Sequence, residues 1–548
     1  MRIFPFSAAA SLYAVCLLIL LAACGGEPPA ASIPPVQTSI TAAEPTSAAT
    51  KIEPTATPRP TDTPEPTATT LPTNTPTPTP APQPVTLAVP AEWEAAVNSV
   101  LSDETADGPP LYRWDIVTAE DTTLALNDGR AHIALARGDG GTIVREEPLA
   151  FSVPFTTNWE MINAADAGAI LANGHNLVRV IPWSAMTPDR KALRVDGQHP
   201  TDPDYPYRES WSLLTAPGYE DAVAVVSALL AEALAPLPTI RLAAVGDINF
   251  DRSPAYIMQT TGDLSYPLSR VKSIFDAADY TIGNLETALG DVGEPAAKRY
   301  PFRSPPESAE ALALGSVDLV SLANNHAQDY GPEALLQGID LLHGASVATV
   351  GGGANEADAY APHIADIGGL SVAFLGYVHV PVEAITHFDT ASWTATADTP
   401  GLAWADPARV SADVAAIRPN VDLVVVILHS GYEYIEEPSE PQVAAARAAV
   451  DAGADLVVGH HAHILQGIHR YNDGVIAYGL GNFLFNIDGP PETAILNVWL
   501  DKNGVRQLEV IPAIIQEHGQ PRPANFEESG PILQRVYYLT TLLNYANP

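Results

Sequence analysis

The feature that most constrains the fold is a regular alternation of apolar runs and amphipathic segments, which begins at Ile240. The runs are short and continuous, as is typical of buried strands, and the segments between them have helical apolar spacing. This alternation predicts an α/β domain with helix-covered sheets. The predicted strands are Ile240–Val245, Tyr280–Ile282, Val317–Leu322, Val347–Val350, Val372–Tyr377, Leu423–Leu428, Leu456–Val458 and Val475–Tyr478, then antiparallel Ile495–Leu500 and Arg506–Ile511. The predicted helices are Ser308–Leu314, Pro332–His343, Pro407–Ile417, Pro441–Ala452 and Ile532–Leu543.

Polar clusters follow several of these strands, at the sheet edge where α/β proteins bind ligands. A single Gly-Asp or Asn-Asn pair is more typical of a turn. Together, however, the clusters supply Asp, Glu, Asn and His, which are ligands for Mn, Zn, Fe or Mg. The sequence therefore predicts one site that holds divalent metal. The clusters are Gly246-Asp247-Ile248-Asn249 with Arg252, Gly283-Asn284-Leu285-Glu286, Asn324-Asn325-His326, His429-Ser430-Gly431-Tyr432-Glu433, and Gly459-His460-His461-Ala462-His463.

The residue types in these clusters suit hydrolysis of a phosphoester. Two divalent ions about 3.5–4 Å apart can bind a phosphate and activate a water, and they are bridged by carboxylate. Asp247 and Glu286 are the candidates for the bridge, and His326 could donate a proton. Arg252 could contact an anion, although a surface or helix-capping role is more typical of arginine. The imidazoles that would complete the metal shell are His429, His461 and His463, which leaves His460 as a structural histidine.

The ordered motifs, together with Gly479-Leu480-Gly481-Asn482-Phe483, resemble the CapA/PgsA capsule-synthesis family over about residues 240–515. The resemblance implies a fold similar to calcineurin-like metallophosphatases, with layers α/β/β/α, and a role in poly-γ-glutamate synthesis or export. It implies the following roles. Asp247, Glu286, Asn325, His429, His461 and His463 are expected to be metal ligands. His326 is expected to be a catalytic acid or transition-state stabiliser, and Glu433 a general base, a further ligand or a partner of a ligand. Apart from the resemblance, Asn249, Arg252 and Asn482 are the predicted substrate contacts.

Two departures from the metallophosphatase pattern affect the expected metal content. The first motif is Asp247-Ile248-Asn249 where metallophosphatases have Asp-x-His. Glu286 stands where they have a bridging aspartate. One metal ion, or two with altered spacing, fits these residues equally well.

The N-terminal part of the chain predicts export and a lipid anchor. After Arg2 and an apolar run, Leu21-Ala22-Ala23-Cys24 resembles a bacterial lipobox, which implies cleavage before Cys24 and lipid attachment to its thiol. An ordinary signal peptide or a single anchor helix is the alternative. Residues 1–23 would be the signal peptide, 24–84 a disordered Pro/Thr-rich spacer, 85–236 a smaller accessory α/β unit, and 237–548 the CapA-like domain. The accessory unit is weakly similar to a solute-binding-protein lobe.

Charge and cysteine content exclude several classes of function. The net charge of −37 argues against nucleic acid as a partner. Both cysteines lie in the first 24 residues, so the folded part has no thiolate site. Three hypotheses remain for this membrane-tethered, extracytoplasmic protein. It could be an enzyme of capsule synthesis that works with capsule-synthesis membrane proteins and acts on a cell-envelope polymer or a phosphoester. It could be a non-catalytic polymer-binding or assembly protein, or a metal-dependent phosphoesterase unrelated to capsule.

Overall fold

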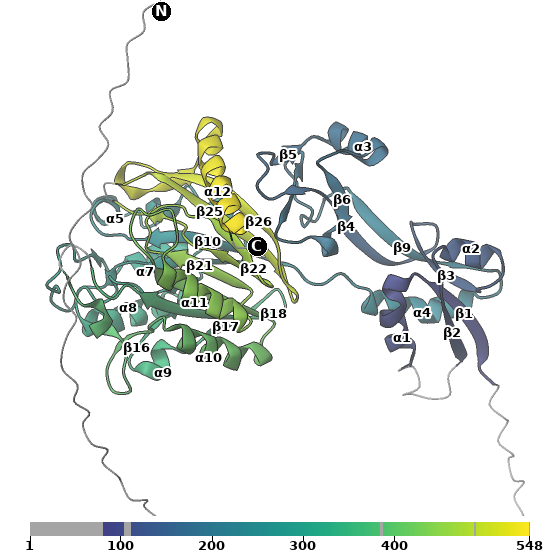
Figure 1. Ribbon diagram of the computed structural model, residues 1–548, viewed down its shortest axis with the longest axis horizontal. Coiled ribbons are helices and arrows are strands. Elements are labelled where there is room, and N and C mark those ends of the chain that lie inside the picture. The colour runs from purple at the N-terminus through teal and green to yellow at the C-terminus, as the bar shows by residue number, and fades with distance from the viewer. Residues whose placement is uncertain (1–80, 103–110, 384–386, 487–488, 547–548) are drawn as a thin grey trace, which may run out of the picture. The chain divides into compact units, whose positions relative to one another are not determined.

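The computed structural model describes residues 81–102, 111–383, 387–486 and 489–546 (Figure 1). The predicted signal peptide, Cys24 and the spacer up to residue 80 lie outside the described residues. Strand β1 begins at Gln83, so the last two residues of the predicted spacer already belong to a strand. No helix within the described ranges is long and apolar enough to cross a membrane.

The N-terminal described part is built on one mixed sheet with strand order β2-β1-β3-β9-β4-β6, and β7 pairs with β4. Side chains of β1 and β3, such as Leu87 and Ile133, pack against α1 and α4. The strands are β1 (Gln83–Val89), β2 (Tyr112–Thr118), β3 (Ile133–Arg137), β4 (Thr142–Pro154), β6 (Arg179–Pro182), β7 (Arg190–Ala192) and β9 (Arg208–Thr215), with a separate pair β5 (Met161–Ile162) and β8 (Arg194–Val195). The helices are α1 (Glu94–Ser102), α2 (Thr122–Asn127), α3 (Ala164–Asn173) and α4 (Glu220–Ala233).

The C-terminal part contains two large sheets. The first has the order β15-β14-β11-β10-β25-β26-β27, and β24 pairs with β10. Its strands are β10 (Ile240–Ile248), β11 (Tyr280–Leu285), β14 (Leu319–Ser321), β15 (Ala348–Val350), β24 (Asn482–Leu484), β25 (Glu492–Asp501), β26 (Gly504–Ile515) and β27 (Pro521–Pro523). The second sheet has the order β17-β18-β20-β21-β23-β22. Its strands are β17 (His363–Ile367), β18 (Leu370–His379), β20 (Leu423–Ser430), β21 (Leu456–His460), β22 (Ile468–Tyr471) and β23 (Gly474–Ala477).

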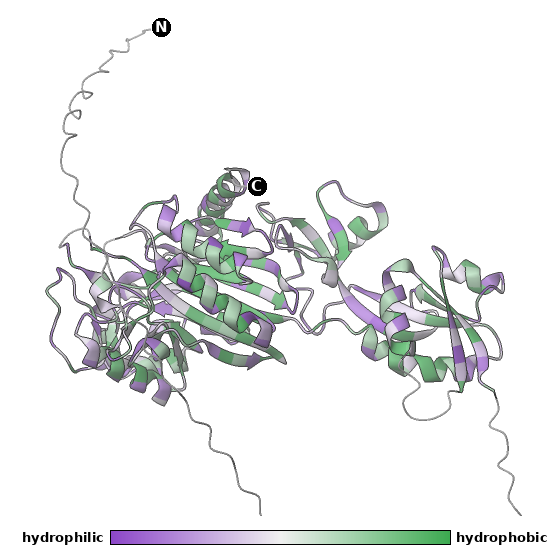
Figure 2. Cartoon of the chain, turned by 60° about the horizontal axis from the view of Figure 1, so that its bottom comes forward, coloured by the Kyte–Doolittle hydropathy of each residue, from purple (hydrophilic) through white to green (hydrophobic). Residues whose placement is uncertain are grey.

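The two sheets and their helices form four layers, which confirms the predicted α/β/β/α arrangement. Successive residues of β10 point to opposite faces, as in any strand. Leu242 and Ala244 enter the core between the sheets, whereas Ala243 and Val245 pack toward the helices outside the first sheet. Figure 2 shows hydrophobic stretches along the strands of this domain. The helices outside the first sheet are α5 (Ser253–Thr261), α6 (Lys272–Phe275), α7 (Ser308–Leu314) and α8 (Pro332–Gly344), those outside the second are α10 (Pro407–Ile417) and α11 (Glu440–Asp451), α9 (Glu356–Ala359) is a short turn of helix, and α12 (Phe526–Ala546) follows β27.

A buried histidine predicts how stability responds to acid. His199 is fully buried and stacks on Trp499 at 4.1 Å between ring centroids. Burial lowers the pKa of His199 to about 3, while an unfolded histidine titrates near 6.5. The unfolded chain therefore binds a proton that the folded chain does not, and stability falls as the pH drops from about 6.5 toward 3.

His199→Gln should flatten this dependence. Between pH 6.5 and 5, we expect the wild type to lose about 2 kcal/mol more unfolding free energy than the variant. Urea titrations at both pH values measure the difference, with the exposed His175→Gln as control. An unchanged slope in His199→Gln would contradict the assignment.

Candidate metal centre

The ends of β10, β11 and β20 meet at one edge of the domain, and strand register fixes which side chains are neighbours. Asp247 of β10 pairs with Asn284 of β11 and with Asn482 of β24. In the second sheet, His429 pairs with His460. The backbones approach so closely that a Cβ on Gly246 would lie 2.0 Å from the carbonyl oxygen of Gly481. Glycine is therefore required immediately before Asp247.

Glu286 lies at the middle of this edge, directly after β11. Its side chain is fully buried, and both carboxylate oxygens lack a hydrogen-bond partner. Its Oε1 is 3.6 Å from Nε2 of His429, 3.8 Å from Nε2 of His463 and 3.9 Å from Nε2 of His326. These separations are too long for hydrogen bonds. They are close to the roughly 3.5 Å between two ligand atoms that share one ion.

The described residues contain two groups with the composition and spacing of a metal site. One comprises Glu286, His429 and His461, and the other comprises Asp247, Glu286 and His463. Ligand atoms within each group lie within 4.8 Å of one another. Because Glu286 belongs to both groups, its carboxylate is placed to bridge two ions. The buried, unpartnered oxygens of Glu286 and the carboxylate–imidazole donor set thus fit divalent metal.

A second set of polar contacts orients these candidate ligands. The Asn482 Oδ1 lies 2.8 Å from Nδ1 of His463, which directs Nε2 of that ring toward Glu286. The Asn325 Oδ1 lies 2.8 Å from Nε2 of His429 and so belongs beside the first group. Asn284 donates to Asp247 Oδ1 at 2.8 Å. Such outer contacts fix ring orientation at metal sites.

Burial and neighbouring charges shift the pKa values of the candidate ligands in different directions. Burial, together with the carboxylates of Asp247 and Glu433, raises the pKa of Glu286 well above its ordinary value. Burial would raise the pKa of Asp247 too, but hydrogen bonds with His460 and His463 hold that pKa well below its usual range. Burial lowers the pKa of His461 to about 3, which keeps this ring neutral and able to bind metal.

The backbone is strained around the centre. His461 has a φ of 85° and His463 a φ of 55°. These values lie in the left-handed region, which residues other than glycine seldom adopt. Arg252 and Tyr434 also have positive φ, at 64° and 60°. Strain of this kind persists where the surroundings enforce it and is common at functional sites.

The remaining predicted residues lie around this cluster rather than in it. The Asn249 Oδ1 accepts the Asp251 N–H at 2.8 Å, so it makes a local turn. Arg252 is exposed, and its guanidinium lies 5.3 Å above the ring of Phe302. Glu433 is exposed in the loop after β20, close enough for its charge to act on Glu286.

The sequence did not point to several buried residues beside the centre. Asn284 belongs to a motif that the sequence singled out, but nothing in that motif assigns it a role. Asp329 follows His326 by three residues, and its Oδ2 lies 2.6 Å from Nδ1 of that ring. Lys298 and Glu383 lie in loops with no periodic pattern, so no sequence signal could have found them.

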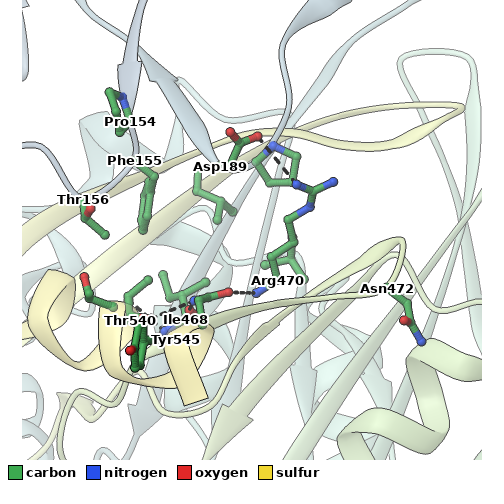
Figure 3. A pocket seen from close by; sticks show the side chains of 14 residues that line it. Pro154, Phe155, Thr156, Asp189, Ile468, Arg470, Asn472, Thr540 and Tyr545 are labelled. Atoms are coloured by element: carbon green, nitrogen blue, oxygen red, sulfur yellow. Dashed lines mark hydrogen bonds and ion pairs between the residues drawn. The ribbon is translucent and has the colours of Figure 1, made fainter. Parts of the chain in front are cut away.

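A separate cavity of about 710 Å³ is lined by residues such as Phe155, Arg470 and Thr540 (Figure 3). None of the candidate metal-centre residues lines it. Some of its polar groups bond to one another: Arg470 pairs with Asp189 at 3.8 Å, and the Asn544 Oδ1 accepts the Arg470 backbone N–H at 3.0 Å. The cavity therefore does not mark the chemistry of the metal centre.

The layers and the edge cluster define the class: this is a metallophosphatase-like α/β protein. The sequence model of the family described as "Bacterial capsule synthesis protein PGA_cap" matches residues 241–487. The chain is 33% identical over 307 residues to "Capsule biosynthesis protein CapA" of Bacillus anthracis, covering 53% of this chain and 72% of that one. The chain belongs to this bacterial capsule synthesis protein family, as the resemblance predicted.

Further similarities extend the comparison. "PGA biosynthesis protein CapA" of Bacillus subtilis (strain 168) is 33% identical over 278 residues, which are 50% of this chain and 71% of that protein. A "Probable polyglutamine synthesis accessory protein" of Mycobacterium tuberculosis is 30% identical, over 41% of this chain and 61% of its own. Among solved structures, oxidised OxyR covers 28% of this chain and 97% of its own at 11% identity, with a TM-score of 0.21. The solute-binding likeness of the accessory unit stays a prediction.

Proposed function

We propose that this protein acts in the synthesis or export of a capsule polymer of the poly-γ-glutamate kind, and that its centre hydrolyses a phosphoester or the polymer with the help of divalent metal. The names of its relatives support the capsule role. The observation that supports the catalytic part of the proposal is the fully buried Glu286. Both of its carboxylate oxygens lack a hydrogen-bond partner, and the residue belongs to both candidate ligand groups. We further propose that a lipid on Cys24 tethers the protein outside the cytoplasm, where capsule-synthesis membrane proteins are its partners.

The chain's own residues supply the acid–base and binding groups for such a reaction. The chemistry contributed by bound divalent ions would be Lewis-acid polarisation of the scissile group and activation of water. His326 is held through Nδ1 by Asp329, so its Nε2 faces the centre. In its doubly protonated form the ring can pass the Nε2 proton to the leaving oxygen, and Nδ1 keeps its own proton on Asp329. Arg252 offers an exposed guanidinium for an anionic substrate group. We propose Glu433, which is exposed in the loop after β20, as the proton acceptor on that side.

Metal analysis of the purified protein tests this proposal most directly. We expect one or two divalent ions per chain, together with hydrolysis of a chromogenic phosphodiester or of poly-γ-glutamate. A protein that takes up no stoichiometric metal would overturn the catalytic proposal. The phosphodiester and polymer assays also separate a general phosphoesterase from a capsule-directed enzyme.

His461→Ala should remove both bound metal and hydrolysis, because His461 belongs to one of the two ligand groups. Elemental analysis and a turnover assay on the same preparation measure the two losses. The matched control is His343→Ala, since His343 is exposed on α8 and is absent from both groups. Activity retained in His461→Ala would contradict its role as a ligand.

An assembly protein that keeps metal for structure is the second candidate, and Asn249 is the observation that favours it. The Asn249 oxygen makes a turn within its own loop, which leaves Asp247, Glu286 and His463 as the protein ligands on that side. Stoichiometric metal without hydrolysis of either substrate would support this alternative.

A further inference from the structure

Lys298 is the most deeply buried cation beside the candidate metal centre. Its side chain has no exposed surface. Nζ donates to Asn325 O and Asp329 Oδ1 at 2.5 Å, and it forms an ion pair with Glu383 Oε1 at the same distance. Three oxygens therefore surround the ammonium group. The ring of Trp393 lies 5.0 Å from Nζ and covers the ammonium. Lys298 is therefore unavailable to bind substrate, and any role that it has must act through its partners.

The first partner, Glu383, controls a candidate ligand. Its Oε1 accepts a hydrogen bond from Asn325 Nδ2 at 3.2 Å and forms the ion pair with Lys298. This contact fixes which end of the Asn325 amide faces the centre, because the nitrogen is bound to Glu383. The Asn325 oxygen is then directed to the position 2.8 Å from Nε2 of His429.

The second partner, Asp329, controls the candidate proton donor. Its Oδ1 binds Lys298, and its Oδ2 lies 2.6 Å from Nδ1 of His326. The same Oδ2 accepts the Phe302 N–H at 2.7 Å, and the Phe302 ring packs against His326 with centroids 4.4 Å apart and the ring planes tilted by 35°. The His326 ring therefore has one orientation, with Nε2 toward Glu286.

We infer that Lys298 is a positioning residue that sets two functions of the centre at once, through separate carboxylates: metal affinity through Glu383 and Asn325, and proton transfer through Asp329 and His326. This inference rests on the proposed function. It goes beyond it by assigning distinct tasks to three residues that lie outside the ligand set. Without the ammonium, two carboxylates would be buried or half-buried side by side without a cation, which is costly in a site of low polarity.

Three variants separate the two tasks when Mn²⁺ affinity and phosphodiester turnover at saturating Mn²⁺ are both measured. Glu383→Gln should weaken Mn²⁺ binding about 10-fold or more and leave saturated turnover within about 2-fold. Asp329→Asn should lower turnover about 100-fold and leave Mn²⁺ affinity unchanged. Lys298→Met should do both. Lys272→Met is the matched control, since this half-exposed lysine of α6 pairs with Asp276 directly after the helix and is absent from the candidate ligand groups.

Wild-type Mn²⁺ affinity and turnover in Lys298→Met would overturn the inference, as would parallel losses of both quantities in Glu383→Gln and Asp329→Asn. If Lys298→Met fails to fold, judged by its thermal unfolding, the split between the other two variants decides alone. A wild-type protein that binds no Mn²⁺ refutes the proposed function instead. If the wild type binds Mn²⁺ but turns over no substrate, weakened affinity in Glu383→Gln with unchanged affinity in Asp329→Asn supports the Lys298 assignment, and any other pattern overturns it.

Discussion

Glu286→Gln is expected to abolish metal binding and, at the same time, to stabilise the metal-free protein. Loss of metal follows because Glu286 belongs to both ligand groups. The gain in stability follows because burial and the neighbouring Asp247 carboxylate raise the pKa of Glu286 and so make its charged form costly in the folded protein. Glutamine keeps the shape and cannot ionise. We expect the free energy of unfolding at pH 7 to rise by about 1–3 kcal/mol.

Elemental analysis measures the loss of metal, and urea unfolding in the presence of a chelator measures the gain in stability. Glu232→Gln, an exposed glutamate on α4, is the matched control and should change neither quantity. A Glu286→Gln protein that keeps its metal would exclude the bridging role. A metal-free variant less stable than the wild type would show that the carboxylate has a structural partner.

His326→Gln is expected to reduce turnover about 10²–10⁴-fold while metal content stays at the wild-type level. The reason is geometric: Asp329 holds Nδ1, and Nε2 lies 3.9 Å from Glu286 Oε1, so the ring faces the centre from outside both ligand groups. Initial rates on the phosphodiester, with elemental analysis of the same sample, test both statements.

His343→Gln provides the control for replacing a histidine at an exposed position. Loss of metal in His326→Gln would make His326 a ligand rather than a proton donor. Turnover within about 10-fold of the wild type would remove it from the chemistry altogether.

Much of the C-terminal fold could be predicted because each buried strand is a continuous apolar run. The predicted helices 308–314 and 407–417 match α7 and α10, since both have helical apolar spacing and α10 also begins with a capping Asp406 followed by Pro407. In the N-terminal part, the sequence does not predict β4. It carries Arg145 and Glu147, charged residues that suggest solvent but are buried as an ion pair at 2.9 Å. Only tertiary structure supplies that pairing.

The candidate site likewise contains some residues that the sequence predicts and others that it does not. Asp247, Glu286, His429 and His461 could be grouped from sequence because each lies at the end of a strand. Strand register fixes the positions of Asp247 and His429. Glu286 and His461 lie in the short loops directly after their strands. Lys298 gave no signal, because its burial depends on partners 27 and 31 residues away and on Glu383, farther along still. Distance along the chain hides such contacts from any periodic pattern.

The centre joins two sheets that share no strand within the described residues. Asp247 and Glu286 come from the first sheet, whereas His429, His461 and His463 come from the second. Sheets packed face to face lie about 10 Å apart, a spacing set by the side chains between them. In evolutionary terms, residues such as Leu242 and Ile427 in that core therefore carry a second constraint. The combined volume of these core side chains sets the distance between the carboxylates of the first sheet and the imidazoles of the second. A substitution that changes the volume of the core therefore also changes the geometry of the metal centre.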